Sequence, residues 1–259
     1  MVNSIKGEAQ SLKPVSMFTI TAKLYAHLIK SIKGSLGEQG LLALDKGIQT
    51  LTEEQIAEMK ERTGKRDFRI DESALFLSNN LGDSDKVEKT FLLYKELQEN
   101  EGLEPYTIYA MMAKMFAHTT KAVVDQFGEM GQEAIKAGVW AFGEERGADI
   151  ARRALLNGKP NTEEYYLSNY DMGRSDLFEY ETNFHPKEIE QTFTKCAFAD
   201  QWKKDGMGKY GILYCQMIDP SIAKGFNPNF EVVHDRYVLK EGDCHFRFQM
   251  KGNDEGNDD

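Results

Sequence analysis

The sequence predicts an α+β fold in which a duplicated N-terminal helical bundle packs on a small C-terminal antiparallel sheet with short helices. Apolar residues recur at helical spacing through most of residues 15–156, and the pattern changes to alternation after residue 173. A helix, turn and helix pattern also occurs twice at a constant offset. We therefore expect a helical region at 1–172, a cysteine-containing α+β region at 173–250 and a disordered acidic tail at 251–259.

Helices in the first region are expected where apolar residues return every three or four positions. A polar connector, 64–85, separates the two copies of the repeated pattern and holds a short apolar piece at 74–77. The expected helices cover residues 15–33, 38–50, 52–63, 86–100 and a long run that continues to about residue 156.

The repeat relates residues 22–47 to residues 113–138, and its identical positions include three glycines, two lysines and one histidine in each copy. An ungapped match of this kind indicates internal duplication, although convergence of two amphipathic helices is the alternative. The paired histidines, His27 and His118, each have lysines one turn before and after them. We therefore expect both on a solvated face rather than in a metal site or a base dyad.

Strands are expected in the second region, where aromatic, β-branched and polar residues alternate. Residues 211–218 are apolar on both faces, which predicts a central strand. The expected strands are 178–184, 188–196, 211–218, 230–239 and 244–250, with a short helix at 197–206.

The charge and the N-terminal residues indicate the class of partner. The chain has 259 residues and a net charge of −10, which argues against nucleic acid and anionic membranes as partners. Residues 1–10 lack a signal-peptide apolar stretch, and no run approaches the roughly 20 apolar residues of a membrane span. We expect a cytoplasmic protein; whether it forms a homo-oligomer is left open.

Three cysteines, Cys196, Cys215 and Cys244, are the main candidates for chemistry. Their odd number argues against a disulfide framework, and they lack the close pairing of zinc-finger ligands. Cys215 and Cys244 also fit simple burial in a core. Cys196 begins the expected short helix, where backbone dipoles lower a thiol pKa, and so has the best local argument for reactivity.

Asp219 follows the expected central strand and can be interpreted in two ways. It can cap a helix that begins at Pro220, or it can place a carboxylate at the end of the strand. On a regular strand Cys215 and Asp219 would share a face at roughly 13 Å, able to flank a ligand but not to touch.

Two His and Arg pairs could form a cationic patch that binds a carboxylate. His234 and Arg236 lie on one expected strand, and His245 and Arg247 repeat the spacing on the next.

The C-terminal half resembles a known family in the order of its short motifs. These are Cys196, Gly206, Cys215 with Asp219, Phe226-Asn227-Pro228, Gly242-Asp243 and Cys244-His245-Phe246. In that order they resemble the L-2-amino-thiazoline-4-carboxylic acid hydrolase family over about residues 175–250.

The resemblance implies hydrolytic opening of a small cyclic amidine that carries a carboxylate; a related cyclic amide or dicarbonyl compound is a close competitor. A thiolate would attack the ring, or a divalent metal such as zinc or manganese, held by the three cysteines, would activate water. The alternative function is a small-molecule-sensing module with a structural cysteine-ligated zinc. The catalytic candidates are Cys196, Cys215, Cys244 and Asp219, and the substrate-binding candidates are His234, Arg236, His245, Arg247 and Asn227.

Overall fold

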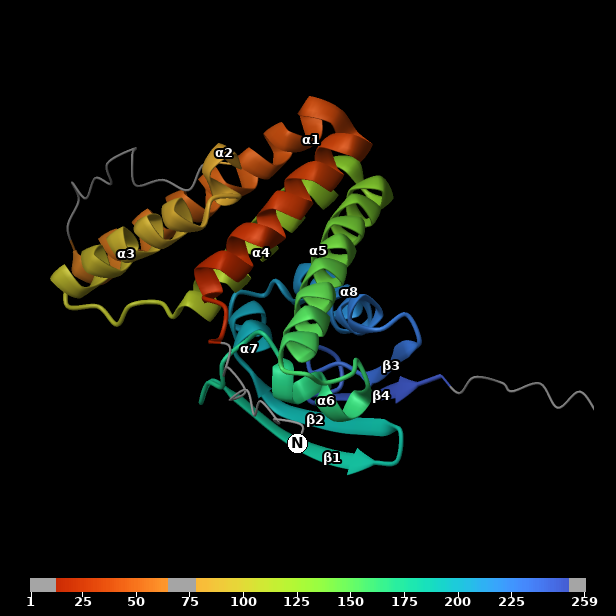
Figure 1. Ribbon diagram of the computed structural model, residues 1–259. Helices are drawn as coiled ribbons and strands as arrows, with labels where there is room; N and C mark the ends of the chain where they lie inside the picture. The colour runs from red at the N-terminus through yellow and green to blue at the C-terminus, as the bar shows by residue number, and fades with distance from the viewer. Residues whose placement is uncertain (1–12, 65–77, 252–259) are drawn as a thin grey trace, which may run out of the picture.

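The computed structural model describes residues 13–64 and 78–251. A layer of long helices stands on a four-stranded antiparallel sheet (Figure 1). The helical layer contains α1 (Met17–Thr63), α2 (Ser78–Leu81), α3 (Ser84–Asn100), α4 (Ile108–Phe127) and α5 (Glu129–Leu156). This arrangement confirms the predicted α+β class.

The sheet and its short helices follow from residue 163 onward. The elements are α6 (Glu163–Tyr166), η2 (Leu167–Asn169), β1 (Phe178–His185), β2 (Glu188–Cys196), α7 (Ala197–Lys204), α8 (Gly208–Phe226), β3 (Phe230–Arg236) and β4 (Cys244–Met250). The strand order is β1-β2-β4-β3, and every neighbouring pair is antiparallel. Four of the five predicted strands are confirmed, with β3 ending at Arg236.

The predicted strand at 211–218 is wrong, because these residues lie within α8. A stretch that is apolar on both faces fits a buried helix as well as a buried strand. Here α8 packs against α4, α5, α7 and β3. Pro220 lies inside α8, so Asp219 is a mid-helix residue and not the predicted N-cap.

Helices predicted separately at 15–33, 38–50 and 52–63 form one element, α1. Gly37 bends it with φ 66° and ψ −159°, a conformation that favours glycine. The equivalent residue of the second copy, Gly128, has φ 59° and separates α4 from α5. The two copies therefore bend at the same position, while the duplication itself stays a prediction.

The expectation that His27 and His118 lie on solvated faces is wrong. His118 is 3% exposed, with its Nε2 3.3 Å from a Glu54 oxygen. His27 is half-buried against α5, where its Nε2 lies 2.6 Å from a Glu145 oxygen. Both faces are covered because α1 packs along α4 and α5.

Helices α5 and α8 approach so closely that glycine is required at their contact. A Cβ built at Gly143 would lie 1.7 Å from the Ser221 hydroxyl oxygen, and one at Gly147 would lie 2.1 Å from the Ile222 carbonyl oxygen. Arg146, between these glycines, is consequently buried. This contact positions Arg146, which lines the cavity described below.

No helix in the described ranges is long and apolar enough to cross a membrane. The predicted tail at 251–259 lies outside the described residues except for Lys251, whose amide donates to the Asn229 carbonyl at 2.8 Å. The short apolar piece at 74–77 also lies outside them.

Candidate functional site

A cavity of about 530 Å³ lies between one face of the sheet, helices α7 and α8, and the segment 166–175. Its wall is mainly aromatic, with a few polar groups among the rings. All three cysteines line it, together with Asp219 and His234. Five of the nine predicted site residues therefore meet at one cavity.

The three cysteines reach the cavity from three different elements. Cys196 ends β2, Cys215 lies on α8 and Cys244 begins β4. All are free thiols, and the Cys244 sulfur accepts a hydrogen bond from the Val238 amide at 3.1 Å.

Burial keeps these thiols protonated at neutral pH. It raises the pKa of Cys196 to about 11 and that of Cys244 to about 12, and it raises the pKa of Cys215 well above its usual value. The amides of Ala199 and Phe198 lower the Cys196 pKa, as expected at a helix start, but burial has the larger effect. The prediction that Cys196 is a low-pKa thiol is therefore wrong.

Asp219 lies one turn after Cys215 on the same face of α8. At a rise of about 1.5 Å per residue the two positions are about 6 Å apart along the axis, rather than the 13 Å expected for a strand. Burial raises the pKa of Asp219 to about 6, while nearby Arg146 lowers it. Within the described residues, its carboxylate has no hydrogen-bond donor. Asp219 can therefore take up a proton near neutral pH.

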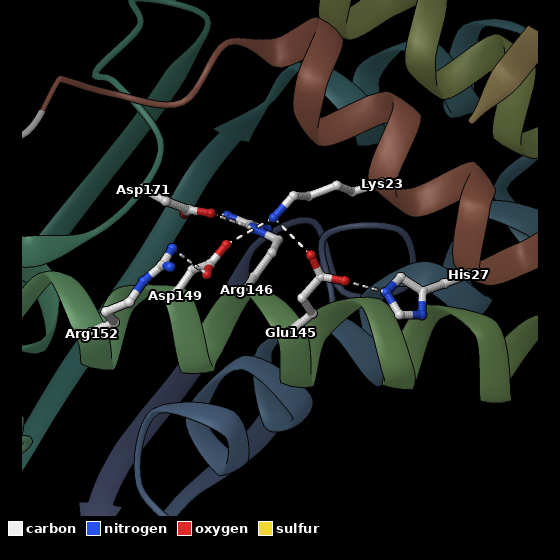
Figure 2. Close-up of polar contacts among 7 residues, drawn as sticks. All are labelled: Lys23, His27, Glu145, Arg146, Asp149, Arg152 and Asp171. Carbon is white, nitrogen blue, oxygen red and sulfur yellow. Dashed lines mark hydrogen bonds and ion pairs between the residues drawn. The ribbon is translucent and has the colours of Figure 1, made fainter. Parts of the chain in front are cut away.

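Arg146 supplies a buried positive charge at the same end of the cavity. It is 2% exposed, and its Nε and Nη2 donate to the two carboxylate oxygens of Asp171 at 2.8 and 2.6 Å (Figure 2). This bidentate pair fixes the plane of the guanidinium group. Sequence reasoning missed Arg146, because it lies in a charged helical stretch that has the composition of a surface helix.

A second set of ion pairs lies beside Arg146 and includes contacts between α5 and α1 (Figure 2). Glu145 lies 2.7 Å from the Lys23 ammonium and 2.6 Å from His27. Asp149 lies 2.8 Å from Lys23 and 2.8 Å from Arg152. The contacts of Lys23 and His27 hold this part of α5 against α1 and so help to position Arg146.

The chain matches the model of the family described as L-2-amino-thiazoline-4-carboxylic acid hydrolase over residues 108–248, more than half of its length. The chain belongs to this family. No curated protein matches. One solved structure, described as "Probing the function of heme distortion in the H-NOX family", is 13% identical over 90% of this chain and 95% of its own, with a TM-score of 0.25.

All residues that line the cavity fall within the part matched by the L-2-amino-thiazoline-4-carboxylic acid hydrolase family. Four residues that carried the resemblance, Cys196, Cys215, Asp219 and Cys244, share this cavity. The family region thus contains the whole candidate site.

The sheet contributes a row of aromatic rings to the cavity of this family member. Tyr180 stacks on Phe193 with ring centroids 4.8 Å apart, and Phe193 stacks on Phe246 at 5.5 Å. His234 meets Phe246 edge-on at 5.0 Å. Both nitrogens of His234 are buried, and neither makes a hydrogen bond to a side chain in the described part of the chain. Burial lowers its pKa to about 4, so the imidazole is neutral.

The four predicted cationic residues do not all lie on one face of the sheet, because His234 lines the cavity whereas Arg236, His245 and Arg247 face away from it. A bulge between His234 and Arg236 turns Arg236 outward, where it lies 3.1 Å from Asp243. His245 and Arg247 alternate with cavity-lining residues of β4 and so also face away from the cavity.

The outward-facing His245 and the loop residue Asn227 have partners of their own. His245 lies 2.9 Å from a Glu190 oxygen and 2.7 Å from an Asp235 oxygen. Asn227 donates to the Asn161 carbonyl at 2.7 Å and accepts from the Asn229 amide at 2.8 Å, which closes the end of α8. The structure therefore brings neither residue to the cavity.

Arg174 is a second arginine on the cavity wall that sequence reasoning missed. It is exposed, and no ion pair to it occurs within residues 13–64 and 78–251.

In the same ranges, no group of three or more His, Cys, Asp and Glu side chains is arranged to hold a metal ion.

Proposed function

We propose that this protein is a hydrolase that opens a small cyclic substrate, such as 2-amino-thiazoline-4-carboxylate or a related cyclic amide or amidine. The observation that supports it most is the Asp219 carboxylate, which has a pKa of about 6, accepts no hydrogen bond from the described residues and lies in an aromatic cavity. A base poised near neutral pH in such a site is suited to proton abstraction.

In the proposed reaction, Asp219 takes a proton from water while the water oxygen bonds to the electrophilic ring carbon between the heteroatoms. The ring bond from that carbon to its leaving heteroatom then breaks, which is the carbon–sulfur bond in the aminothiazoline. The proton held by Asp219 passes to the leaving atom, and in the aminothiazoline the second water proton passes from the new hydroxyl group to the ring nitrogen as the carbon–oxygen double bond forms. The product is a carbamoyl amino acid, and the carboxylate returns to its starting state.

The cysteines have a different part in this scheme from the thiolate that the sequence suggested. Because burial holds all three as thiols, none is a ready nucleophile at neutral pH. As neutral groups, they enclose the ring beside Asp219 and exclude bulk water. Attack by Cys215 would require Asp219, one turn away, to remove the thiol proton first.

Arg174 is the proposed contact for the substrate carboxylate. Arg146 is already neutralised by Asp171, whereas Arg174 stands on the wall without an acidic partner among the described side chains. A guanidinium group binds a carboxylate through two parallel hydrogen bonds. This contact would place the anionic group at Arg174 and the ring toward Asp219.

The test is turnover of 2-amino-thiazoline-4-carboxylate by purified protein, followed by release of the product thiol, with zinc and manganese measured in the same sample. Asp219→Asn should lower kcat/KM by about 100-fold or more, the usual contribution of a general base. Asp176→Asn, at an exposed aspartate outside the cavity lining, is the matched control. Full activity of Asp219→Asn would exclude the base role, and absence of turnover on a panel of cyclic amidines and amides would overturn the hydrolase proposal.

A further inference from the structure

We infer that the natural substrate carries an uncharged apolar extension on its ring, such as an aromatic group, which lies on the inner face of β1. This inference rests on the proposed function and specifies its substrate class. The binding surface is the β1 shelf, defined as Tyr180, Thr182 and Phe184. All three residues line the cavity that contains Asp219 and the cysteines.

The size of the cavity is the first reason. At about 530 Å³ it lies within the roughly 300–1,000 Å³ range of sites that hold drug-sized ligands. A single five-membered ring with one carboxylate would fill only part of it. The remaining space would hold water against aromatic walls, which is unfavourable compared with an apolar group.

The position of the exposed apolar surface is the second reason. Tyr180 is 43% and Phe184 is 66% exposed, and both are on the edge strand of the sheet. Single exposed aromatic residues are common on protein surfaces. These two, however, line the same cavity as the reactive groups, so a bound substrate can cover them.

The row of rings connects the β1 shelf to the inner part of the site. Tyr180 stacks on Phe193, and Phe193 stacks on Phe246. Phe246 follows Cys244 by two residues and lies on the same face of β4. Aromatic groups bind such surfaces by offset stacking or edge contacts. A flat substituent would thus extend from the reactive centre along this row toward β1.

The polarity of the β1 shelf decides the chemistry of the extension. The shelf contains no Asp, Glu, His, Lys or Arg side chain, and the Thr182 hydroxyl already accepts a hydrogen bond from Gln191 at 2.9 Å. A charged extension would lose its hydration without gaining a partner. The shelf therefore fits an apolar group, while the substrate carboxylate is left to Arg174.

The experiment compares 2-amino-thiazoline-4-carboxylate with its 5-phenyl derivative. Affinities are measured by isothermal titration on the Asp219→Asn variant, so that turnover does not interfere, and kcat/KM is measured on the wild type. The phenyl derivative should bind about tenfold tighter or more, as expected when an aromatic group leaves water. Equal or weaker binding of the phenyl derivative would overturn the inference.

Two variants test whether the tighter binding of the phenyl derivative comes from the β1 shelf. Tyr180→Ser and Phe184→Ser should each remove most of the gain while leaving the affinity for the unsubstituted ring within about twofold. Val233→Ser is the matched control, since Val233 is 39% exposed on the opposite face of the sheet. A gain that persists in both shelf variants would overturn the assignment.

Residues 1–12 are the other candidate occupant, because Pro14 lies next to Gly173 and the Val15 amide donates to the Asp171 carbonyl at 2.7 Å. A phenyl gain that appears only after deletion of residues 1–12 would assign the shelf to that segment and overturn the inference. Tighter phenyl binding without turnover of either compound would contradict the hydrolase proposal alone. Turnover without a phenyl gain would contradict only the extension.

Discussion

Cys215 and Asp219 stand one helical turn apart on the same face of α8, and both line the cavity. The Asp219 charge opposes ionisation of Cys215 and so adds to the effect of burial on the thiol pKa. Asp219, whose pKa is about 6, ionises first. At neutral pH the pair is therefore a carboxylate beside a neutral thiol, which is the state that a general base requires.

Activity should depend on pH through Asp219. Since the proposed base must be ionised, kcat/KM should rise as pH increases through about 6 and then level off. In Asp219→Asn the residual kcat/KM should not show this rise with pH. A wild-type profile flat from pH 5 to 8 would contradict the assignment; the measurement is kcat/KM across that range at constant ionic strength.

Asp219 should also lower stability above its pKa. Its folded pKa, about 6, is higher than the usual 3.8, so the folded state binds more protons between these values and the free energy of unfolding falls as pH rises through this window. At pH 7.5 Asp219→Asn should therefore be more stable by about 1–3 kcal/mol. At pH 3.5, where the carboxyl is protonated in both states, the difference should be small. Urea unfolding at the two pH values measures both quantities.

Serine substitution of each cysteine should preserve the reaction. Because the thiols are protonated at pH 7, Cys196→Ser, Cys215→Ser and Cys244→Ser should each lower kcat/KM by less than about tenfold, and iodoacetamide should react slowly. The check is turnover together with the alkylation rate at pH 7 and pH 9. Loss of activity in one variant only, with rapid alkylation of that residue at pH 7, would support covalent catalysis instead.

The alternating segments of the sequence predicted the sheet well, because each strand has one face in the core and one outside. The same logic failed at 211–218, since α8 is buried on several sides and lacks the polar stripe that reveals a helix. This error also misplaced Asp219, whose distance from Cys215 depends on the element that carries both.

Other features of the site have no local sequence signal. Arg146 and Asp171 are far apart in the sequence and are paired only by the fold. The bulge after His234 changes which side chains face the cavity, and alternation alone does not reveal it. The cysteines were identified by residue type and by resemblance, but their pKa values depend on burial that the sequence does not report.

Replacing Arg146 should affect both stability and the pH profile. Arg146→Met leaves Asp171 buried without its partner, which should cost about 3–5 kcal/mol. Because Arg146 lowers the pKa of Asp219, the rise of kcat/KM with pH should occur at higher pH in this variant. Arg146→Lys, which keeps the charge, should leave the rise of kcat/KM with pH closer to its wild-type position.

Arg152→Met, at an exposed pair with Asp149, is the control and should change stability by less than about 1 kcal/mol. An unmoved rise of kcat/KM with pH in a folded Arg146→Met protein would contradict the coupling.

The two copies of the helical repeat contact each other reciprocally, and this makes a matched prediction. A Cβ at Gly47 would lie 2.6 Å from the His118 carbonyl oxygen, and one at Gly138 would lie 2.9 Å from the Leu28 Cα and 3.3 Å from the His27 carbonyl oxygen. Such reciprocity is the signature of a two-fold interface, as in a symmetric dimer. If the copies descend from one unit, Gly47→Ala and Gly138→Ala should each lower the free energy of unfolding by about 1–3 kcal/mol through overpacking.

The control for this pair is Gly34→Ala, since a Cβ at Gly34 meets nothing within 4 Å. Alanine at this helical position should raise stability by about 0.5–1 kcal/mol. Urea unfolding of the three variants gives the comparison directly. Tolerance of alanine at one of the two contact glycines, with strong destabilisation at the other, would show that the contacts are not equivalent and would weaken the case for duplication.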